Sequence, residues 1–251
     1  MNHLERSKIE QKETEPKPFA TFFIVRHGDT MYNEEFKDKN SEFDLTETGI
    51  KQIKDLASQI EKETEPHETI WVIRSPRVRA KSTVEILEKQ LKETGHNVVG
   101  LGGGRPSLSN VKIYNQEGKN IYKEKDEQKY LSDMEKVLER VSKETDYYVK
   151  SRKGSLENPI TESIEDYKKK VKTLLAGLIK FVHKRQGNNE KIILVTHSEW
   201  LDTLLENYFG KKIEKEVDSA PTGGLIELKI LQDKLIFSFA NEKIIVKNKL
   251  Q

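Results

Sequence analysis

The sequence predicts an α/β fold in which a largely parallel sheet is covered by helices on both faces. Three short apolar runs, rich in β-branched and aromatic residues, are typical of buried strands: residues 21–25, 69–73 and 191–196. Each run is followed, directly or after a loop, by apolar residues at helical spacing. Strands that alternate with amphipathic helices build layered folds with parallel strands. We therefore expect a three-layer α/β/α sandwich with a mostly parallel central sheet.

Three segments have the apolar spacing of amphipathic helices. Thr46 can cap the first segment, whose apolar face consists of Ile50, Ile53, Ala57 and Ile60. The second follows the 69–73 run and is marked by Val78, Val84, Leu87 and Leu91. The third is a long helix marked by Ile164, Tyr167, Val171, Leu174, Leu178 and Val182.

The chain is expected to form one domain over residues 19–251, preceded by a disordered tail over residues 1–18. A charged segment at about 105–160 interrupts the alternation and is interpreted as an insertion, with a helix near residues 128–149. Three short apolar runs near the end of the chain, LIELKI, KLIFSF and KIIV, are expected to be strands that close one edge of the sheet.

The composition narrows the classes of partner and chemistry. Of 251 residues, 44 are Lys or Arg and 42 are Asp or Glu, so a net charge of +2 favours neither nucleic acid nor a membrane surface as partner. The sequence has no Cys, which excludes thiolate nucleophiles and Cys-ligated metals. No apolar run approaches the length of a membrane span or a signal peptide, and we expect a cytoplasmic protein.

The residues able to do chemistry follow the three predicted strands. Arg26, His27 and Gly28 come after the first, a segment with Arg77 and Arg79 after the second, and His197 and Ser198 after the third. Open α/β sheets bind ligands at the carboxyl ends of their strands. Two imidazoles and several guanidinium groups at one edge would suit an anionic tetrahedral ligand such as a phosphate.

An imidazole among arginines can serve as a nucleophile. When one ring nitrogen donates to a backbone carbonyl, the tautomer is set and the other nitrogen has a free lone pair that can attack phosphorus. Neighbouring guanidinium charges lower the pKa of the imidazole and so favour this neutral form. Gly28, directly after His27, permits a close backbone approach to a ligand.

These motifs, taken together, resemble those of the histidine phosphatase superfamily, the phosphoglycerate mutase-like family. The hallmark Arg-His-Gly stands at residues 26–28 and continues as Asp-Thr-x-x-Asn to residue 33. The other matching motifs follow in family order: Leu-Thr-x-x-Gly at 45–49 with Gln52, Ser-Pro-x-x-Arg-Ala-x-x-Thr at 75–83, Glu-Ser-x-x-Asp at 162–166 and Val-Thr-His at 195–197. The resemblance implies the fold predicted above and a phosphohistidine intermediate, with no metal and no cofactor.

The resemblance also implies roles for single residues. His27 would be the nucleophile, and Arg26, Arg79 and His197 would hold the phosphoryl oxygens. Thr30 and Asn33 would lie near the rim of the pocket, and Gly28 and Ser198 would border the phosphate. Arg77 competes with Arg79 for its role, but Arg79 stands in the Arg-Ala-x-x-Thr register of the family.

The general acid departs from the family pattern. Family members with this Arg-His-Gly motif donate a proton to the leaving oxygen from a Glu in a Leu-x-Glu segment, and here the most similar stretch places Asn110 at that position. An amide cannot protonate an alkoxide. Glu117, in the same loop, is expected to substitute for the missing acid, and Glu199 is a second candidate. The Gly that usually follows the second His of the family is replaced by Ser198.

The sequence leaves three functions open. The first is a phosphatase that acts on a small or peptide-borne phosphomonoester through a phosphohistidine on His27. The second is a phosphoglycerate mutase-type phosphotransferase, ranked lower because the Leu-x-Glu-Arg run of mutases is absent. The third is a weakly active or inactive relative that binds a phosphorylated ligand or a protein, suggested by Asn110. The oligomeric state cannot be derived from the sequence.

Overall fold

A computed structural model describes residues 17–30, 45–109, 112, 136, 162–185, 189–213 and 218–248. These residues form a seven-stranded sheet in the order β3-β2-β4-β1-β5-β6-β7. The strands are β1 (Ala20–Arg26), β2 (Thr69–Arg74), β3 (Asn97–Gly100), β4 (Glu190–Thr196), β5 (Leu225–Ile230), β6 (Lys234–Phe239) and β7 (Glu242–Lys247). The helices are α1 (Glu47–Lys62), α2 (Val78–Glu93), α5 (Ile164–Lys184) and α6 (Ser198–Tyr208), with a short 3-10 helix, η2, at Pro106–Leu108.

The sheet is mostly, but not entirely, parallel. β3, β2, β4 and β1 run parallel to their neighbours, whereas β5, β6 and β7 pair antiparallel at the other side of β1. The three C-terminal strands therefore form one edge of the sheet, as the sequence predicts. In the parallel half, β4 lies between β2 and β1, with Thr196 opposite Arg26 and Val195 opposite Arg74.

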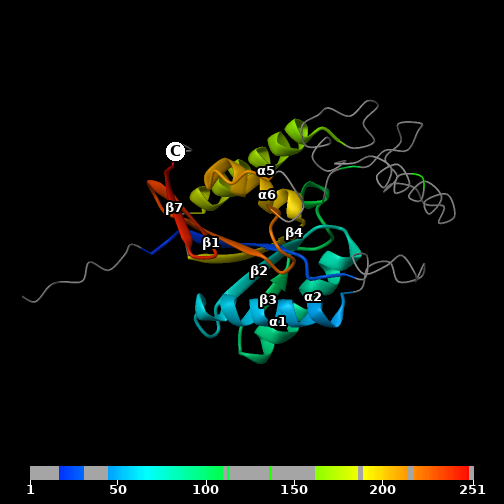
Figure 1. Cartoon of the computed structure of the whole chain (residues 1–251). Helices are drawn as coiled ribbons and strands as arrows, with labels where there is room; N and C mark the ends of the chain where they lie inside the picture. Colours follow the sequence, from blue (N-terminus) through cyan, green and yellow to red (C-terminus); the bar gives the residue numbers. More distant parts are fainter. Residues whose placement is uncertain are drawn as a thin grey trace, which may run out of the picture.

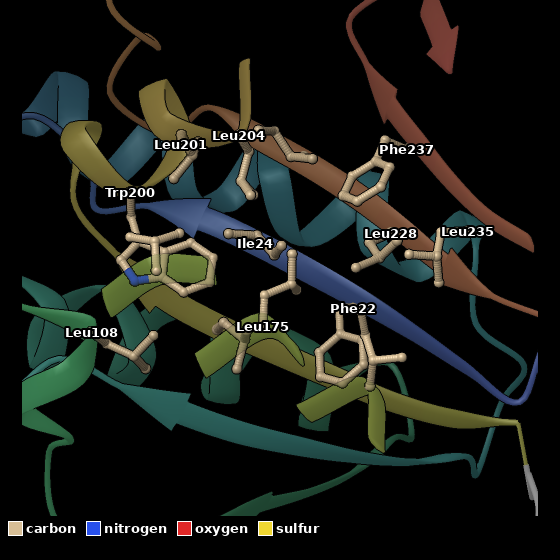
Figure 2. Packing of buried hydrophobic residues seen from close by; sticks show 14 of the residues in the cluster. Phe22, Ile24, Leu108, Leu175, Trp200, Leu201, Leu204, Leu228, Leu235 and Phe237 are labelled. Atoms are coloured by element: carbon tan, nitrogen blue, oxygen red, sulfur yellow. The ribbon is translucent and has the colours of Figure 1, made fainter. Parts of the chain in front are cut away.

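Two helical layers cover the two faces of the sheet (Figure 1). Alternate residues of β1 point to opposite faces because the side-chain period of a strand is two. Phe23 and Val25 pack with α1 and α2, and Phe22 and Ile24 pack with α5 and α6. Figure 2 shows Phe22 and Ile24 on the second face, in a cluster that includes Trp200 of α6. The predicted three-layer α/β/α fold is confirmed.

The helices follow the predicted periodicity with small departures. Thr46 caps α1, and its hydroxyl accepts a hydrogen bond from the backbone N–H of Gly49. Ile50 and Val78 were expected in apolar faces but are 36% and 42% exposed, since each lies in the first turn of its helix. In α5 the core contacts pass to Leu175 and Ile179, while Leu174 and Leu178 are only partly buried.

Several expectations lie outside the described residues. The described part of the chain omits most of the predicted tail, most of the 105–160 insertion and the predicted helix near residues 128–149 except for residue 136. Among the described residues, the strand that the prediction missed is β3, a run of four residues at the sheet edge. None of the helices in the described ranges has the length and apolarity needed to cross a membrane.

Candidate active site

Three adjacent parallel strands end at one edge of the sheet and bring the predicted residues together. β1, β4 and β2 end at Arg26, Thr196 and Arg74. Two backbone hydrogen bonds continue the strand pairing by one residue beyond these ends: the N–H of His27 donates to Thr196 O at 3.1 Å, and the N–H of Ser75 donates to Val195 O at 2.9 Å. This continuation places the segments that carry His27, Ser75 and His197 side by side.

The imidazole of His27 has a defined tautomer. Its Nδ1 lies 2.8 Å from the carbonyl oxygen of Gly28, and because a carbonyl can only accept, Nδ1 has the proton. Its Nε2 therefore has no proton and can accept a hydrogen bond. Nε of Arg79 donates to this Nε2 at 2.9 Å. His27 is 7% exposed, so the lone pair is held in a buried site.

Arg79 joins the two site histidines. Besides its bond to His27, its guanidinium donates to Nδ1 of His197 from Nη2 at 3.0 Å and from Nε at 3.3 Å. The two imidazole rings lie 5.2 Å apart, centroid to centroid, with an interplanar angle of 65°. The fork of one arginine thus reaches the facing nitrogens of both rings. Arg77, the rival residue, acts on His197 through its charge.

Ser75 binds the other ring nitrogen of His197. Because Nδ1 of His197 accepts from Arg79, its proton resides on Nε2, which lies 2.8 Å from the buried hydroxyl of Ser75. The same hydroxyl accepts the backbone N–H of Arg77 at 3.3 Å. Ser75 stands inside the Ser-Pro motif, but sequence reasoning assigned it no role.

The environment keeps both imidazoles neutral. Burial, and then the charge of Arg79, lower the pKa of His27 well below 6.5, although its bond to Gly28 opposes the shift. The pKa of His197 is also lowered well below 6.5, by burial first and then by electrostatic interactions with Arg79, His27, Arg77 and Arg26. The sequence predicts that neighbouring arginines lower these pKa values. The larger cause of the shift is burial, which follows from the fold.

Arg26 is held by a distant loop. Its Nη1 donates to the carbonyl of Ala220, and its Nε is buried without a hydrogen-bond partner among the described residues. The backbone of the loop is fastened to the strand end: Gly223 N–H donates to His27 O at 3.1 Å, and Arg26 N–H donates to Gly224 O at 2.9 Å. No sequence motif pointed to this loop, because its contacts join residues almost 200 positions apart.

A network from α1 and α2 supports the backbone after His27. Asp29 N–H donates to Oε1 of Gln52 at 2.9 Å, and Gly28 N–H donates to the hydroxyl of Thr83 at 3.2 Å. The close approach at Gly28 is to the backbone of α1, since a Cβ there would lie 2.8 Å from Gly49 O. The absence of a side chain at Gly28 and Gly49 thus allows α1 to pack against the site.

The remaining predicted residues are less central or lie outside the described residues. Thr30 is buried and pairs by backbone with Leu45. Ser198 is the first residue of α6, and its hydroxyl donates to Oε2 of Glu199 at 3.3 Å. Asn33, Asn110 and Glu117 lie outside the described residues. In the parts of the chain that the structure describes, no group of three His, Asp or Glu side chains could hold a metal ion.

Comparisons with known proteins bear on the family resemblance and on the fold. Residues 22–101 match the family model of the histidine phosphatase superfamily, branch 1. This stretch includes His27, Ser75 and Arg79, so the resemblance is confirmed over the part of the chain that carries the first three motifs. A search of curated proteins finds no match to this chain.

Solved structures share the fold at low sequence identity. A phosphoglycerate mutase from Bacillus anthracis is 13% identical with a TM-score of 0.54, covering 91% of this chain and 92% of the mutase. The α-ribazole phosphatase of Shigella flexneri is 17% identical with a TM-score of 0.54, covering 91% of this chain and 100% of the phosphatase. A phosphoserine phosphatase mutant from Entamoeba histolytica, in complex with phosphoserine, is 18% identical with a TM-score of 0.51, covering 92% and 98%.

Proposed function

Residues 22–101 of this chain resemble the histidine phosphatase superfamily. We propose on this premise that the protein is a phosphomonoesterase whose nucleophile is His27. The observation that carries the proposal is the state of the His27 ring. Nδ1 donates to Gly28 O, and Nε2 presents its lone pair beside the guanidinium of Arg79. A neutral imidazole held in this tautomer can attack phosphorus.

The arginines and the second histidine form the phosphoryl-binding cradle. The Arg79 N–H groups that donate to the two imidazoles would donate to phosphoryl oxygens instead, in the bidentate manner that suits a planar guanidinium. Arg26 and His197 would bind the other oxygens. Two guanidinium charges in a buried site offset the charge of the phosphate and stabilise it as it moves through the transition state.

Group transfer then proceeds in two steps. In the first, Nε2 of His27 bonds to phosphorus while the bond from phosphorus to the leaving oxygen breaks, and a carboxylic acid gives that oxygen a proton. The charge on the phosphorylated ring is stabilised by the bond from Nδ1 to Gly28 O. In the second, water attacks phosphorus, phosphate leaves with the former P–N electron pair returning to His27, and the water proton returns to the carboxylate.

The proton donor is assigned to Glu117 or Glu199. Glu199 lies in the first turn of α6, two residues after His197. An aryl phosphate needs little protonation of its leaving oxygen, whereas an alkyl phosphate depends on the acid, which typically contributes about 10²–10⁴-fold. Replacing the acid with Gln should therefore slow alkyl ester hydrolysis much more than aryl ester hydrolysis. The same small loss on both esters, for both variants, would leave neither Glu as the donor.

The substrate is proposed to be a small or peptide-borne phosphomonoester. The structures of similar fold include a phosphatase in complex with phosphoserine and a phosphoglycerate mutase, both of which handle small phosphorylated molecules. The mutase activity remains the alternative. Rapid interconversion of phosphoglycerates would favour it over hydrolysis.

The decisive experiment measures turnover of an aryl phosphate, an alkyl phosphate and 3-phosphoglycerate by wild type and His27→Ala. We expect His27→Ala to abolish turnover and the acid-labile phosphoryl-enzyme trapped by quenching. His67→Ala is the matched control, because His67 is exposed and lies on the loop before β2, outside the cradle. Turnover that survives His27→Ala would refute the phosphohistidine route. Phosphate binding without turnover of any ester would favour the third function, an inactive relative that binds a phosphorylated ligand or a protein.

A further inference from the structure

Asp202 is a buried carboxylate that the proposed reaction does not use. It lies on α6, five residues after His197, and is completely buried among the apolar residues of that helix. A buried carboxylate is costly unless hydrogen bonds compensate for its lost hydration. The partners of Asp202 therefore indicate what the residue does.

Two of those partners lie in the segment over residues 219–224, here called the Arg26 loop. Oδ1 of Asp202 accepts the backbone N–H of Ala220 at 2.8 Å, and Oδ2 accepts the hydroxyl of Ser219. The carbonyl of the same Ala220 accepts from Nη1 of Arg26. One buried residue is thus held at its N–H by Asp202 while its carbonyl holds the guanidinium of Arg26.

The other end of the Arg26 loop is held independently of Asp202. Gly223 and Gly224 are hydrogen-bonded to the backbone of His27 and Arg26. Nε2 of Gln52 donates to the hydroxyl of Thr222 at 3.0 Å. Asp202 therefore anchors the loop at its Ala220 end, where the loop contacts the Arg26 side chain.

We propose that Asp202 is a positioning residue for Arg26, acting through the backbone of Ala220 on the orientation of the phosphate-binding guanidinium. In the described part of the chain, the Ala220 carbonyl accepts from Nη1 of that guanidinium, while Nε has no acceptor. A shift of the Ala220 carbonyl thus moves the group directly. Misplacement of a binding group by about 1 Å can cost about 10²-fold in rate.

The inference rests on the proposed function, because it takes Arg26 to bind a phosphoryl oxygen. The test measures the binding of inorganic phosphate and vanadate by calorimetry, together with kcat and KM for an aryl phosphate. We expect Asp202→Ala to weaken phosphate binding by about 10-fold to 100-fold and to raise KM. Asp202→Asn should stay close to wild type, because the amide oxygen still accepts the Ala220 N–H.

A double-mutant cycle separates positioning from general destabilisation. If Asp202 acts through Arg26, adding Asp202→Ala to Arg26→Ala should not weaken phosphate binding further. Should Asp202→Ala fail to fold, Ser219→Ala provides a second test that retains the carboxylate. The loss of phosphate affinity in Ser219→Ala should likewise vanish in the Arg26→Ala background. Thr203→Val is the control on the same helix, because the Thr203 hydroxyl donates to its own helix at Glu199 O.

The outcomes distinguish the two proposals. A wild-type protein that binds neither phosphate nor vanadate would contradict the proposed function itself. A wild-type protein that binds phosphate, combined with unchanged binding in Asp202→Ala and Ser219→Ala, would overturn the role of Asp202. The role of Asp202 would also be overturned if the affinity lost in Asp202→Ala added to that lost in Arg26→Ala. The same holds if Thr203→Val lost as much phosphate affinity as Asp202→Ala.

Discussion

Nε of Arg79 lies 2.9 Å from Nε2 of His27, the ring nitrogen that has no proton because Nδ1 donates to Gly28. The same guanidinium reaches Nδ1 of His197 at 3.0 Å. The cation that would bind the phosphoryl oxygens therefore faces the lone pair that would attack phosphorus. As a phosphate enters, its oxygens replace the imidazole nitrogens as acceptors of the Arg79 N–H groups, and the lone pair of His27 becomes available.

This geometry separates the roles of Arg79 and Arg77. Arg79→Ala should lower kcat/KM for an aryl phosphate by about 10²–10³-fold, the loss typical for removing a donor to developing negative charge. Arg79→Lys should recover little of this loss, because an ammonium cannot reproduce the fork. Arg77→Ala is the matched control, since Arg77 acts on His197 through its charge. A larger loss in Arg77→Ala than in Arg79→Ala would reverse the assignment.

Ser75 should matter through His197. A serine hydroxyl can accept from Nε2 of His197, as in the tautomer described above, or donate to it when Nδ1 has the proton and faces a phosphate. Ser75→Ala removes both options and leaves a buried N–H without a partner, at a cost of about 1–3 kcal/mol in stability. We expect a clear loss of kcat/KM with a weaker affinity for phosphate.

Ser58→Ala is the control for the Ser75 variant. The Ser58 hydroxyl lies on the outer side of α1 and donates to Lys54 O at 3.3 Å, so its removal should leave kinetics unchanged. Equal phosphate affinities in Ser75→Ala and wild type would show that His197 needs no support from the hydroxyl.

Activity should persist at acid pH. Burial and the charge of Arg79 lower the pKa of His27 well below 6.5, so its nucleophilic form survives below that pH. The test measures kcat/KM on an aryl phosphate as a function of pH, and we expect the midpoint of its acid limb to lie clearly below pH 6.5. Arg79→Gln should move this limb upward, because one of the causes that lower the pKa is removed. A limb at or above 6.5 in the wild type would contradict a neutral, buried His27.

The same shifts couple stability to pH. In the unfolded chain His27 and His197 titrate near 6.5, whereas in the folded chain they titrate lower. Between these values the unfolded chain binds more protons, so the free energy of unfolding decreases as the pH falls from about 7 through that window. Urea unfolding at pH 7.5 and 5.5 measures this difference. We expect a smaller difference in His197→Ala, and an unchanged difference would refute the coupling.

Gly49 should resist substitution. A Cβ at this position would lie 2.2 Å from Asp29 O and 2.8 Å from Asp29 N, both backbone atoms that cannot easily move. Overpacking of this kind costs about 1–3 kcal/mol or more, and α1 would be displaced from the backbone that follows His27. We expect Gly49→Ala to lower both the free energy of unfolding and kcat/KM.

Gly177→Ala is the matched control for that substitution. Gly177 lies in α5, and a Cβ added there would have no described atom within 4 Å. Ala should therefore stabilise the helix by up to about 1 kcal/mol without affecting kinetics. Similar destabilisation in both variants would mean that the packing of Gly49 against Asp29 is not the cause.

Local chemistry let the sequence predict most of the layered fold. The apolar runs became β1, β2 and β4 within one or two residues, and Thr46 caps α1 as expected. The pattern was less exact where neighbouring elements decide burial. Leu174 and Leu178 are helical positions next to the ones that the sheet covers, so periodicity alone could not rank them below Leu175 and Ile179. The short strand β3 has too few residues for a clear alternation.

The sequence by itself determined which residue types follow the strands, because His27, Arg79 and His197 lie in compact motifs with recognisable spacing. Only the tertiary structure decided how they meet: β4 lies between β1 and β2, which lets one guanidinium reach both imidazoles. The tertiary structure also decided that Asp202 and Ala220 hold the side chain of Arg26. Hydrogen bonds between distant residues leave no periodicity or spacing in a single sequence, and they exist only once the sheet has placed the strand ends together.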